Sequence, residues 1–238
     1  MGPSMLACLL HGYQQPAGAA NGEIAGSGLL PPGVIHANLM TGLLNLEQQM
    51  QLDAGRLVGA RQVASPHYNS RPQGEQPSLL VIHNISLPPG EFGGPWIDAL
   101  FTGTLDPDAH PYFAEIAALR VSAHCLIRRD GEIVQYVPFN QRAWHAGVSC
   151  WQGRESCNDF SIGIELEGTD VLPYTDAQYQ SLTRVTRLLM QHYPLTAENI
   201  TGHSDIAPQR KTDPGAAFDW QRYRQMITEA ASMEDPGA

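Results

Sequence analysis

The run Leu79-Leu80-Val81-Ile82-His83 indicates which kind of fold this chain adopts, because four consecutive apolar residues end in an imidazole. An uninterrupted apolar run of this length is typical of a strand that is covered on both faces of a sheet. We therefore expect an interior strand that delivers the side chain of His83 to a sheet edge.

Segments on either side of this run complete the predicted sheet. The stretch from Asp159 to Gly168 predicts a second buried strand, in which Glu165 interrupts the apolar residues. Two β-rich runs, 121–127 and 132–136, flank Asp130-Gly131 and predict a hairpin, since Asp-Gly favours a tight turn.

Helices are expected between and after these strands. A capping box at Thr175–Gln178 predicts a helix that ends near His192, and a last helix is expected from Asp219. An extended segment over 56–63 and a short strand over 199–202 complete the elements. Because strands and helices alternate without a clean βαβ repeat, we predict an α/β fold with a mixed β-sheet flanked by helices.

The composition fits one globular domain and disfavours several kinds of partner. With 238 residues the chain can bury one core, and its formal net charge of -10 disfavours attraction to nucleic acid or to anionic membranes. No apolar run approaches the roughly eighteen residues of a membrane helix. The 4 cysteines are few and irregularly spaced, which favours a reducing compartment, the cytoplasm, over a disulfide framework.

Residues 1–52 differ from the rest of the chain, with scattered Gly, Pro, Ala, Gln and Asn and neither Lys nor Arg. Such a composition buries too little apolar surface to offset the entropy lost on ordering. We expect a poorly structured N-terminal extension here, for which a translation start upstream of the natural one is one explanation. The functional domain is expected over 53–232 and a flexible tail over 233–238.

The loop from Asn199 to Gly215 brings an imidazole, an ammonium and a carboxylate together in His203, Lys211 and Asp213. Imidazole and carboxylate suit Zn²⁺, and a catalytic zinc takes three protein ligands and leaves its fourth position to water. His83 is the best candidate for the missing ligand. Taken singly, each residue has a plainer explanation, because single histidines are often structural and Asp-Pro-Gly is a good turn sequence.

Two further residues complete a hydrolytic site. Glu165 should be partly buried, and burial raises the pKa of a carboxylate toward the range of a general base. Lys211 could stabilise the oxyanion of a tetrahedral intermediate. The alternatives are an ion pair with an arginine or a solvent-facing strand for Glu165, which apply more strongly to Glu167, and a solvated surface position for Lys211.

Five motifs occur in order along the chain: Val81-Ile-His83-Asn84-Ile-Ser, Val121-Ser-Ala-His124, Ala143-Trp-His145-Ala-Gly147, the run from Asn158 to Gly168, and Thr201-Gly-His203 continuing through Lys211-Thr-Asp213-Pro-Gly. Together they resemble the zinc-dependent N-acetylmuramoyl-L-alanine amidases, most closely the AmpD-type 1,6-anhydro-N-acetylmuramyl-L-alanine amidases of peptidoglycan recycling. The resemblance covers roughly Arg56 to Tyr223. It implies the fold shared with phage amidases and peptidoglycan recognition proteins, a mixed sheet flanked by helices.

The resemblance also carries roles onto matching positions. It implies zinc ligands at His83, His203 and Asp213, the catalytic glutamate at Glu165 and the transition-state cation at Lys211. Stretches that shape the substrate cleft contain Asn84, Tyr112, Arg120 and Trp144. Arg120 is expected to meet a carboxylate of an anhydromuropeptide, the small-molecule substrate that the resemblance implies. We expect a monomer, since nothing in the sequence calls for a larger assembly. Ser204 stands where many relatives have Cys, a neighbour of the second histidine whose exchange should leave zinc binding intact.

Three other functions stay open on the sequence. A peptidoglycan-binding module of the same fold would need no catalysis, and a broader murein amidase would act on intact cell wall. A cysteine hydrolase would use Cys150 or Cys157 with His145, although free cysteines are more often inert. The long loop over 86–94, which leaves the predicted His83 strand, is expected to form a rim of the substrate cleft.

Overall fold

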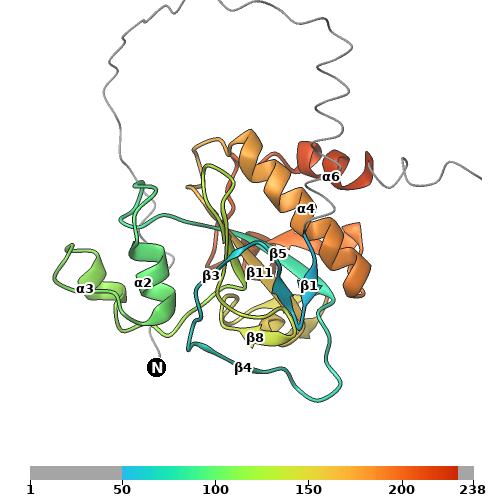
Figure 1. Cartoon of the computed structure of the whole chain (residues 1–238), viewed down its shortest axis with the longest axis horizontal. Helices are drawn as coiled ribbons and strands as arrows, with labels where there is room; N and C mark the ends of the chain where they lie inside the picture. The colour runs from blue at the N-terminus through green and yellow to red at the C-terminus, as the bar shows by residue number, and fades with distance from the viewer. Residues whose placement is uncertain (1–49, 230–238) are drawn as a thin grey trace, which may run out of the picture.

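The computed structural model of the chain describes residues 50–229 (Figure 1). The predicted extension over 1–52, apart from residues 50–52, and the predicted tail over 233–238 lie outside the described residues. Leu52 already belongs to the short strand β1 (Leu52–Asp53), which pairs with β2 (Arg56–Leu57). The described fold therefore begins at the N-terminal edge of the predicted domain.

A six-stranded mixed sheet forms the centre of the molecule, as the sequence predicts. Its strands lie in the order β12-β5-β11-β6-β7-β3. They span Ile200–Gly202 (β12), Leu79–Ile85 (β5), Ser161–Glu167 (β11), Cys125–Ile127 (β6), Ile133–Gln135 (β7) and Arg61–Gln62 (β3). The β6 and β7 pair is antiparallel and every other pair is parallel. The predicted hairpin is the β6 and β7 pair, with strands shorter than expected.

The two central strands are buried on both faces, which explains their continuous apolar runs. Every residue of β11 is buried, as are the first five residues of β5. Because successive side chains of a strand point to opposite faces, Leu80 and Ile82 pack toward the helices while Leu79, Val81 and His83 face the other side. The interpretation of Glu165 and Glu167 as a solvent-facing strand surface is therefore wrong.

Helices cover the sheet from different sides (Figure 1). The long helix α4 (Asp176–His192) begins at Thr175, whose hydroxyl and Gln178 form the predicted capping box. Its apolar face packs with α6 (Trp220–Glu229) over one face of the sheet. A separate apolar cluster includes α2 (Trp96–Thr102) and α3 (Phe113–Ile116), which lie away from α6 (Figure 1).

Short elements complete the described part. They are the strand pairs β4 (Tyr68–Ser70) with β8 (Gln141–Ala143) and β9 (Cys150–Trp151) with β10 (Arg154–Glu155), the 3₁₀ turns η1 (Cys157–Asp159) and η2 (Ala197–Asn199), and α5 (His203–Ile206). Within residues 50–229, none of the helices is both long and apolar enough to cross a membrane.

Candidate metal centre

The pairing of β5 with β11 sets the first part of the site. The strands are parallel and in register, so that His83 lies opposite Glu165. Both side chains point to the face away from α4, and both residues are buried. Two residues that are 82 positions apart in the sequence thus become direct neighbours at the carboxyl ends of adjacent strands.

The edge strand β12 supplies the second histidine. It pairs in parallel with β5 and ends at Gly202, after which His203 opens the short helix α5. A Cβ atom at Gly202 would lie 2.8 Å from the Cδ atom of Pro214, so glycine allows the returning loop to pass close by. The backbone N–H of Ser204 donates to the carbonyl oxygen of Asp213 at 2.9 Å, which holds the acidic residue beside the histidine.

The side chains of His83, His203 and Asp213 converge. The two Nδ1 atoms are 2.9 Å apart, and Oδ2 of Asp213 lies 3.0 Å from Nδ1 of His83 and 3.1 Å from Nδ1 of His203. Their candidate ligand atoms all lie within 4.8 Å of one another. The structure therefore brings together the three residues that the sequence nominates as metal ligands.

The protonation of these groups suits a cation. Burial, with the nearby His203, lowers the pKa of His83 to about 4, so this imidazole is neutral at neutral pH. Burial raises the pKa of Asp213, but its contacts with His203 and His83 outweigh burial and hold that pKa well below its ordinary value. The centre thus offers neutral imidazole and ionised carboxylate, the ligand forms that bind zinc.

The rear nitrogen of His203 supports the same conclusion. Its Nε2 lies 3.2 Å from the carbonyl oxygen of Ala146, and a carbonyl can only accept, so Nε2 carries the proton. The lone pair on Nδ1 is then directed at the Nδ1 atom of His83 and at the carboxylate of Asp213. Electron-pair donors that face one another at these distances fit a bound cation, and two nitrogens with one oxygen fit zinc.

Glu165 has the environment of a general base. Burial, reinforced by the negative charge of Asp213 and opposed by Lys211, raises the pKa of Glu165 well above its ordinary value. Its Oε2 atom is buried and has no hydrogen-bond partner within residues 50–229. Lys211 is also buried, and burial lowers its pKa. The interpretation of Lys211 as a solvated surface residue is therefore wrong.

The predicted ion pair with an arginine occurs at Glu167 instead. One carboxylate oxygen accepts from the backbone N–H of Gly93 at 2.6 Å and lies 3.3 Å from Nη1 of Arg128, and the other accepts from the N–H of Arg129 at 3.2 Å. Glu167 therefore secures the loop over 86–94, while Glu165 on the same strand face stays available for chemistry.

A cleft of about 150 Å³ opens over the metal centre. Besides the three candidate ligands, Glu165 and Lys211, it is lined by Asn84, Tyr112 and Trp144 of the predicted cleft residues, and by Ser86, Leu87 and Pro89 of the predicted rim. Arg120 is exposed and does not line it, although the next residue, Val121, does. Arg210 lines the cleft, a position that sequence reasoning missed because only its adjacency to Lys211 pointed to it.

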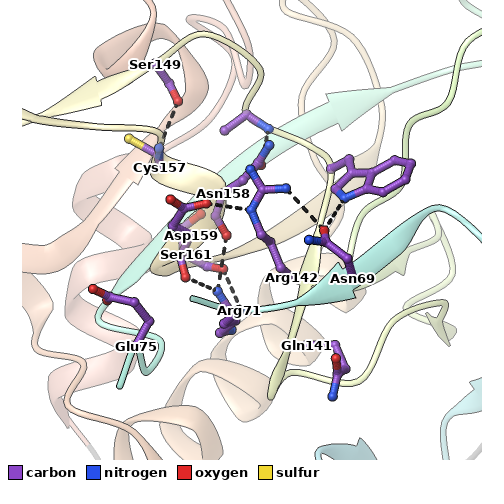
Figure 2. A network of polar contacts seen from close by, with 12 residues as sticks. Asn69, Arg71, Glu75, Gln141, Arg142, Ser149, Cys157, Asn158, Asp159 and Ser161 are labelled. Carbon is purple, nitrogen blue, oxygen red and sulfur yellow. Dashed lines mark hydrogen bonds and ion pairs between the residues drawn. The ribbon is translucent and has the colours of Figure 1, made fainter. Parts of the chain in front are cut away.

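Two of these cleft residues are held by neighbours. Nδ2 of Asn84 donates to Asp170 at 2.8 Å and to the carbonyl oxygen of Pro214 at 3.1 Å, which ties β5 to the loop of Asp213. Nε1 of Trp144 donates to Oδ1 of Asn69 at 2.7 Å. The same oxygen of Asn69 also accepts from Nη1 of Arg142 at 3.2 Å (Figure 2).

A larger and more open hollow of about 630 Å³ lies elsewhere on the surface, around Arg61, Asp98, Arg128 and Glu132. Its charged groups pair with one another: Arg61 contacts both acids within 3.0 Å, and Arg128 contacts both within 3.6 Å. This network stabilises the surface, and the convergent groups of a reaction centre lie in the smaller cleft.

Within residues 50–229, the geometry does not pair His145 with a cysteine nucleophile. Both ring nitrogens of His145 are engaged, Nδ1 with Nε2 of His83 at 2.9 Å and Nε2 with Oγ of Ser161 at 3.1 Å. Burial raises the pKa of Cys157, so its thiolate is scarce at neutral pH. Cys150 is exposed and lies outside the lining of the cleft.

Comparison with known proteins gives concordant matches. The sequence profile of a family described as N-acetylmuramoyl-L-alanine amidase matches residues 73–216. The 1,6-anhydro-N-acetylmuramyl-L-alanine amidase AmpD of Escherichia coli strain K12 is 75% identical over 179 residues, which cover 75% of this chain and 98% of that protein. The protein of the same name from Haemophilus influenzae is 60% identical over 177 residues, or 74% and 96% of the two chains. The crystal structure of a selenomethionine AmpD derivative superposes with a TM-score of 0.74 at 74% identity, covering 75% of this chain and 99% of that one.

Proposed function

This chain belongs to the N-acetylmuramoyl-L-alanine amidase family, and on that premise we propose how its own residues divide the work of catalysis. The chain is a hydrolase that cleaves the amide bond between 1,6-anhydro-N-acetylmuramic acid and L-alanine of muropeptides, a step of peptidoglycan recycling. The observation that carries the proposal is the convergence of His83, His203 and Asp213 beneath a cleft that Glu165 and Lys211 also line.

We propose that His83, His203 and Asp213 hold a zinc ion. The support is the donor set itself, with a lone pair of His203 and an ionised carboxylate directed at one point beside a neutral His83. When bound, zinc lowers the pKa of a water molecule and polarises a carbonyl group.

Glu165 acts as the general base and then as the general acid. It takes a proton from the attacking water, whose oxygen forms a bond to the lactyl carbonyl carbon of the muramic acid. The bond from that carbon to the L-alanine nitrogen then breaks, and Glu165 returns the proton to the leaving amine. Its burial favours this role, because burial raises the pKa of the carboxylate and so makes it a better proton acceptor than an ordinary glutamate.

Lys211 stabilises the charge that develops during the attack. As water adds, the carbonyl oxygen becomes negative, and an ammonium in a buried cleft interacts with that charge more strongly than it would in water. The backbone N–H of Lys211 donates to Ala207 at 2.9 Å, which anchors the residue in the loop after α5. The ammonium group of Lys211 therefore extends toward the reacting carbonyl from an anchored backbone.

The predicted cleft residues bind the sugar and the stem peptide. Asn84 and Tyr112 shape the wall of the cleft, and the indole of Trp144, with its N–H already donated to Asn69, offers its apolar face. We propose that the stem peptide leaves the cleft past Val121 and presents a carboxylate to the exposed Arg120. Preference for the anhydro form over intact murein would follow from how closely the sugar fits this wall.

We further propose that the enzyme works as a cytoplasmic monomer. The described cysteines, Cys125, Cys150 and Cys157, are all free thiols, as in a reducing compartment. Cell fractionation and sedimentation of the purified chain test the two statements. Activity confined to the cell envelope, or a stable dimer at micromolar protein, would contradict them.

The test of the proposed function combines substrate and inhibitor. The purified chain should release stem peptide from anhydromuropeptides faster than from polymeric sacculi, lose activity on treatment with a metal chelator and regain it with Zn²⁺. Iodoacetamide should leave the activity in place. Loss of activity with iodoacetamide alone would favour a cysteine hydrolase, and binding of muropeptide without hydrolysis would favour a binding module.

A further inference from the structure

The rear nitrogens of both histidine ligands bind to consecutive residues of one loop. Nε2 of His83 lies 2.9 Å from Nδ1 of His145, and Nε2 of His203 lies 3.2 Å from the carbonyl oxygen of Ala146. The two ligands are 120 residues apart and come from different strand ends. A shift of the dipeptide His145-Ala146 would therefore displace both imidazoles.

A single buried side chain anchors the dipeptide. Oδ1 of Asn158 accepts the backbone N–H of His145 at 3.1 Å and that of Ala146 at 2.8 Å. The carbonyl oxygen of Asn158 lies 3.2 Å from Nη1 of Arg71, whose guanidinium also donates to the carbonyl oxygens of Asp159 and Ser161 (Figure 2). The loop is thus tied through Asn158 and Arg71 to the start of β11.

The ring of His145 is held independently by β11. Its Nε2 lies 3.1 Å from Oγ of Ser161. A Cβ atom at Gly163 would come within 2.4 Å of the ring, so the imidazole packs directly on the backbone of that glycine. A hydroxyl and a glycine two residues apart on one strand face thereby set the position of the ring.

The protonation of the two ring nitrogens in contact restricts how His83 can bind a metal. Between His83 and His145 only one nitrogen can carry the shared proton, and His83 can bind a metal through Nδ1 only if its own Nε2 carries it. His145 must then accept at Nδ1 and keep its proton on Nε2, where the hydroxyl oxygen of Ser161 can accept it. The contacts of His145 match this tautomer on both sides of its ring.

We propose that His145 is a positioning residue for the zinc site: its Nδ1 atom, set by Ser161, Gly163 and Asn158, orients the His83 imidazole and directs the lone pair of that ligand at the metal. The inference rests on the proposed zinc site, which it deepens. His145, which also lines the cleft, acts on the metal site through its contact with His83, and Ala146 plays the equivalent part for His203 through its carbonyl oxygen.

The test compares zinc affinity among three variants of the full chain. His145→Phe keeps a ring on Gly163 but removes the acceptor, and His145→Asn places an amide oxygen near the position of Nδ1. His124→Phe is the control, because His124 is a buried histidine beside the ring of His145 that bonds Gly163, Gln141 and Arg71 but no candidate ligand. Competition with a chelating indicator gives the zinc dissociation constant, and thermal unfolding of the metal-free proteins reports the fold.

We expect zinc to bind roughly 10–100-fold more weakly to His145→Phe than to the parent chain, as is typical when a hydrogen-bond partner of a ligand is lost. His145→Asn should recover part of the loss, and His124→Phe should stay within about twofold even if its melting temperature falls. Parent-like affinity in a folded His145→Phe would overturn the inference and leave the proposed function standing. A parent chain that binds no zinc would overturn both.

A second measurement needs no substitution. In the zinc-loaded parent chain with ¹⁵N-labelled histidine, NMR couplings between ring nitrogens and carbon-bound protons report which nitrogen is protonated. The inference requires the proton of His145 on Nε2 and that of His83 on Nε2. A proton on Nδ1 of His145 would contradict it whatever the variants do.

Discussion

Replacing Glu165 by glutamine removes the proposed base while keeping the shape of the side chain. Among the described residues that line the cleft, the carboxylates are Glu165 and Asp213, and Asp213 is engaged by both histidines. Loss of a general base costs about 10²–10⁴-fold in rate. Because no second free carboxylate lines the described cleft, we expect the upper part of that range, about 10³–10⁴-fold in kcat, or about 4 to 5.5 kcal/mol.

The same substitution should stabilise the metal-free protein at neutral pH. Burial raises the pKa of Glu165 well above its ordinary value, so the folded chain binds this proton more tightly than the unfolded chain. The stability that the group contributes is fully present below its ordinary pKa and is lost as the pH rises through the raised pKa. At neutral pH the buried carboxylate is therefore unfavourable, and the amide in Glu165→Gln relieves that cost.

The assay measures kcat for release of stem peptide from an anhydromuropeptide, zinc content, and the melting temperature of the metal-free protein. Glu167→Gln is the matched control, since Glu167 is buried on the same strand face but bonds Arg128 and two backbone N–H groups. It should keep zinc and most of kcat while losing roughly 1.5–3 kcal/mol of stability, the contribution of hydrogen bonds to a charged group. Near-parent kcat in zinc-loaded Glu165→Gln would refute the assignment of the base.

Three further substitutions test the cleft. Lys211→Met should lower kcat about 10²–10³-fold with zinc retained. Because burial lowers the pKa of Lys211, the parent chain should lose activity at a lower alkaline pH than it would with an ordinary lysine. Lys211→Arg should shift that loss of activity to higher pH. Trp144→Ala should raise KM about tenfold, equivalent to about 1.4 kcal/mol of lost stacking and burial, and Trp144→Phe should recover most of it; equal KM values for the two variants would argue against stacking. Arg120→Ala should raise KM about fivefold, as an exposed ion pair is worth about 1 kcal/mol, and an unchanged KM would remove this residue from the substrate site.

The central elements could be predicted from the sequence because their signals are local. The apolar run before His83 and the capping box at Thr175 depend on neighbours in the chain, and both strand and helix form where expected. The register that places Glu165 opposite His83 follows from two runs that must both be buried, so their polar residues share one sheet end. The fold and the candidate metal set were therefore within reach of pattern and chemistry.

The contacts that support the site could not be predicted from the sequence, because they arise between segments that have no periodic relation. Nothing in the sequence says that Asn158 accepts two backbone N–H groups, or that Gly163 is where the ring of His145 packs. From the sequence, His145 is a candidate partner of Cys150 or Cys157 in a cysteine hydrolase, whereas in the structure it contacts His83. The sequence could not show which of Arg210 and Arg120 lines the cleft, because the position of each side chain depends on how the loops after α5 and α3 return to the sheet.

The proposed catalysis depends on one cation held by two imidazoles and one carboxylate. X-ray absorption at the zinc edge of the purified chain, together with metal analysis, tests this most directly. We predict one zinc per chain, with nitrogen and oxygen ligands at about 2.0–2.2 Å and without the sulfur distance of about 2.3 Å. A sulfur ligand, or a fully active enzyme without zinc, would contradict the account.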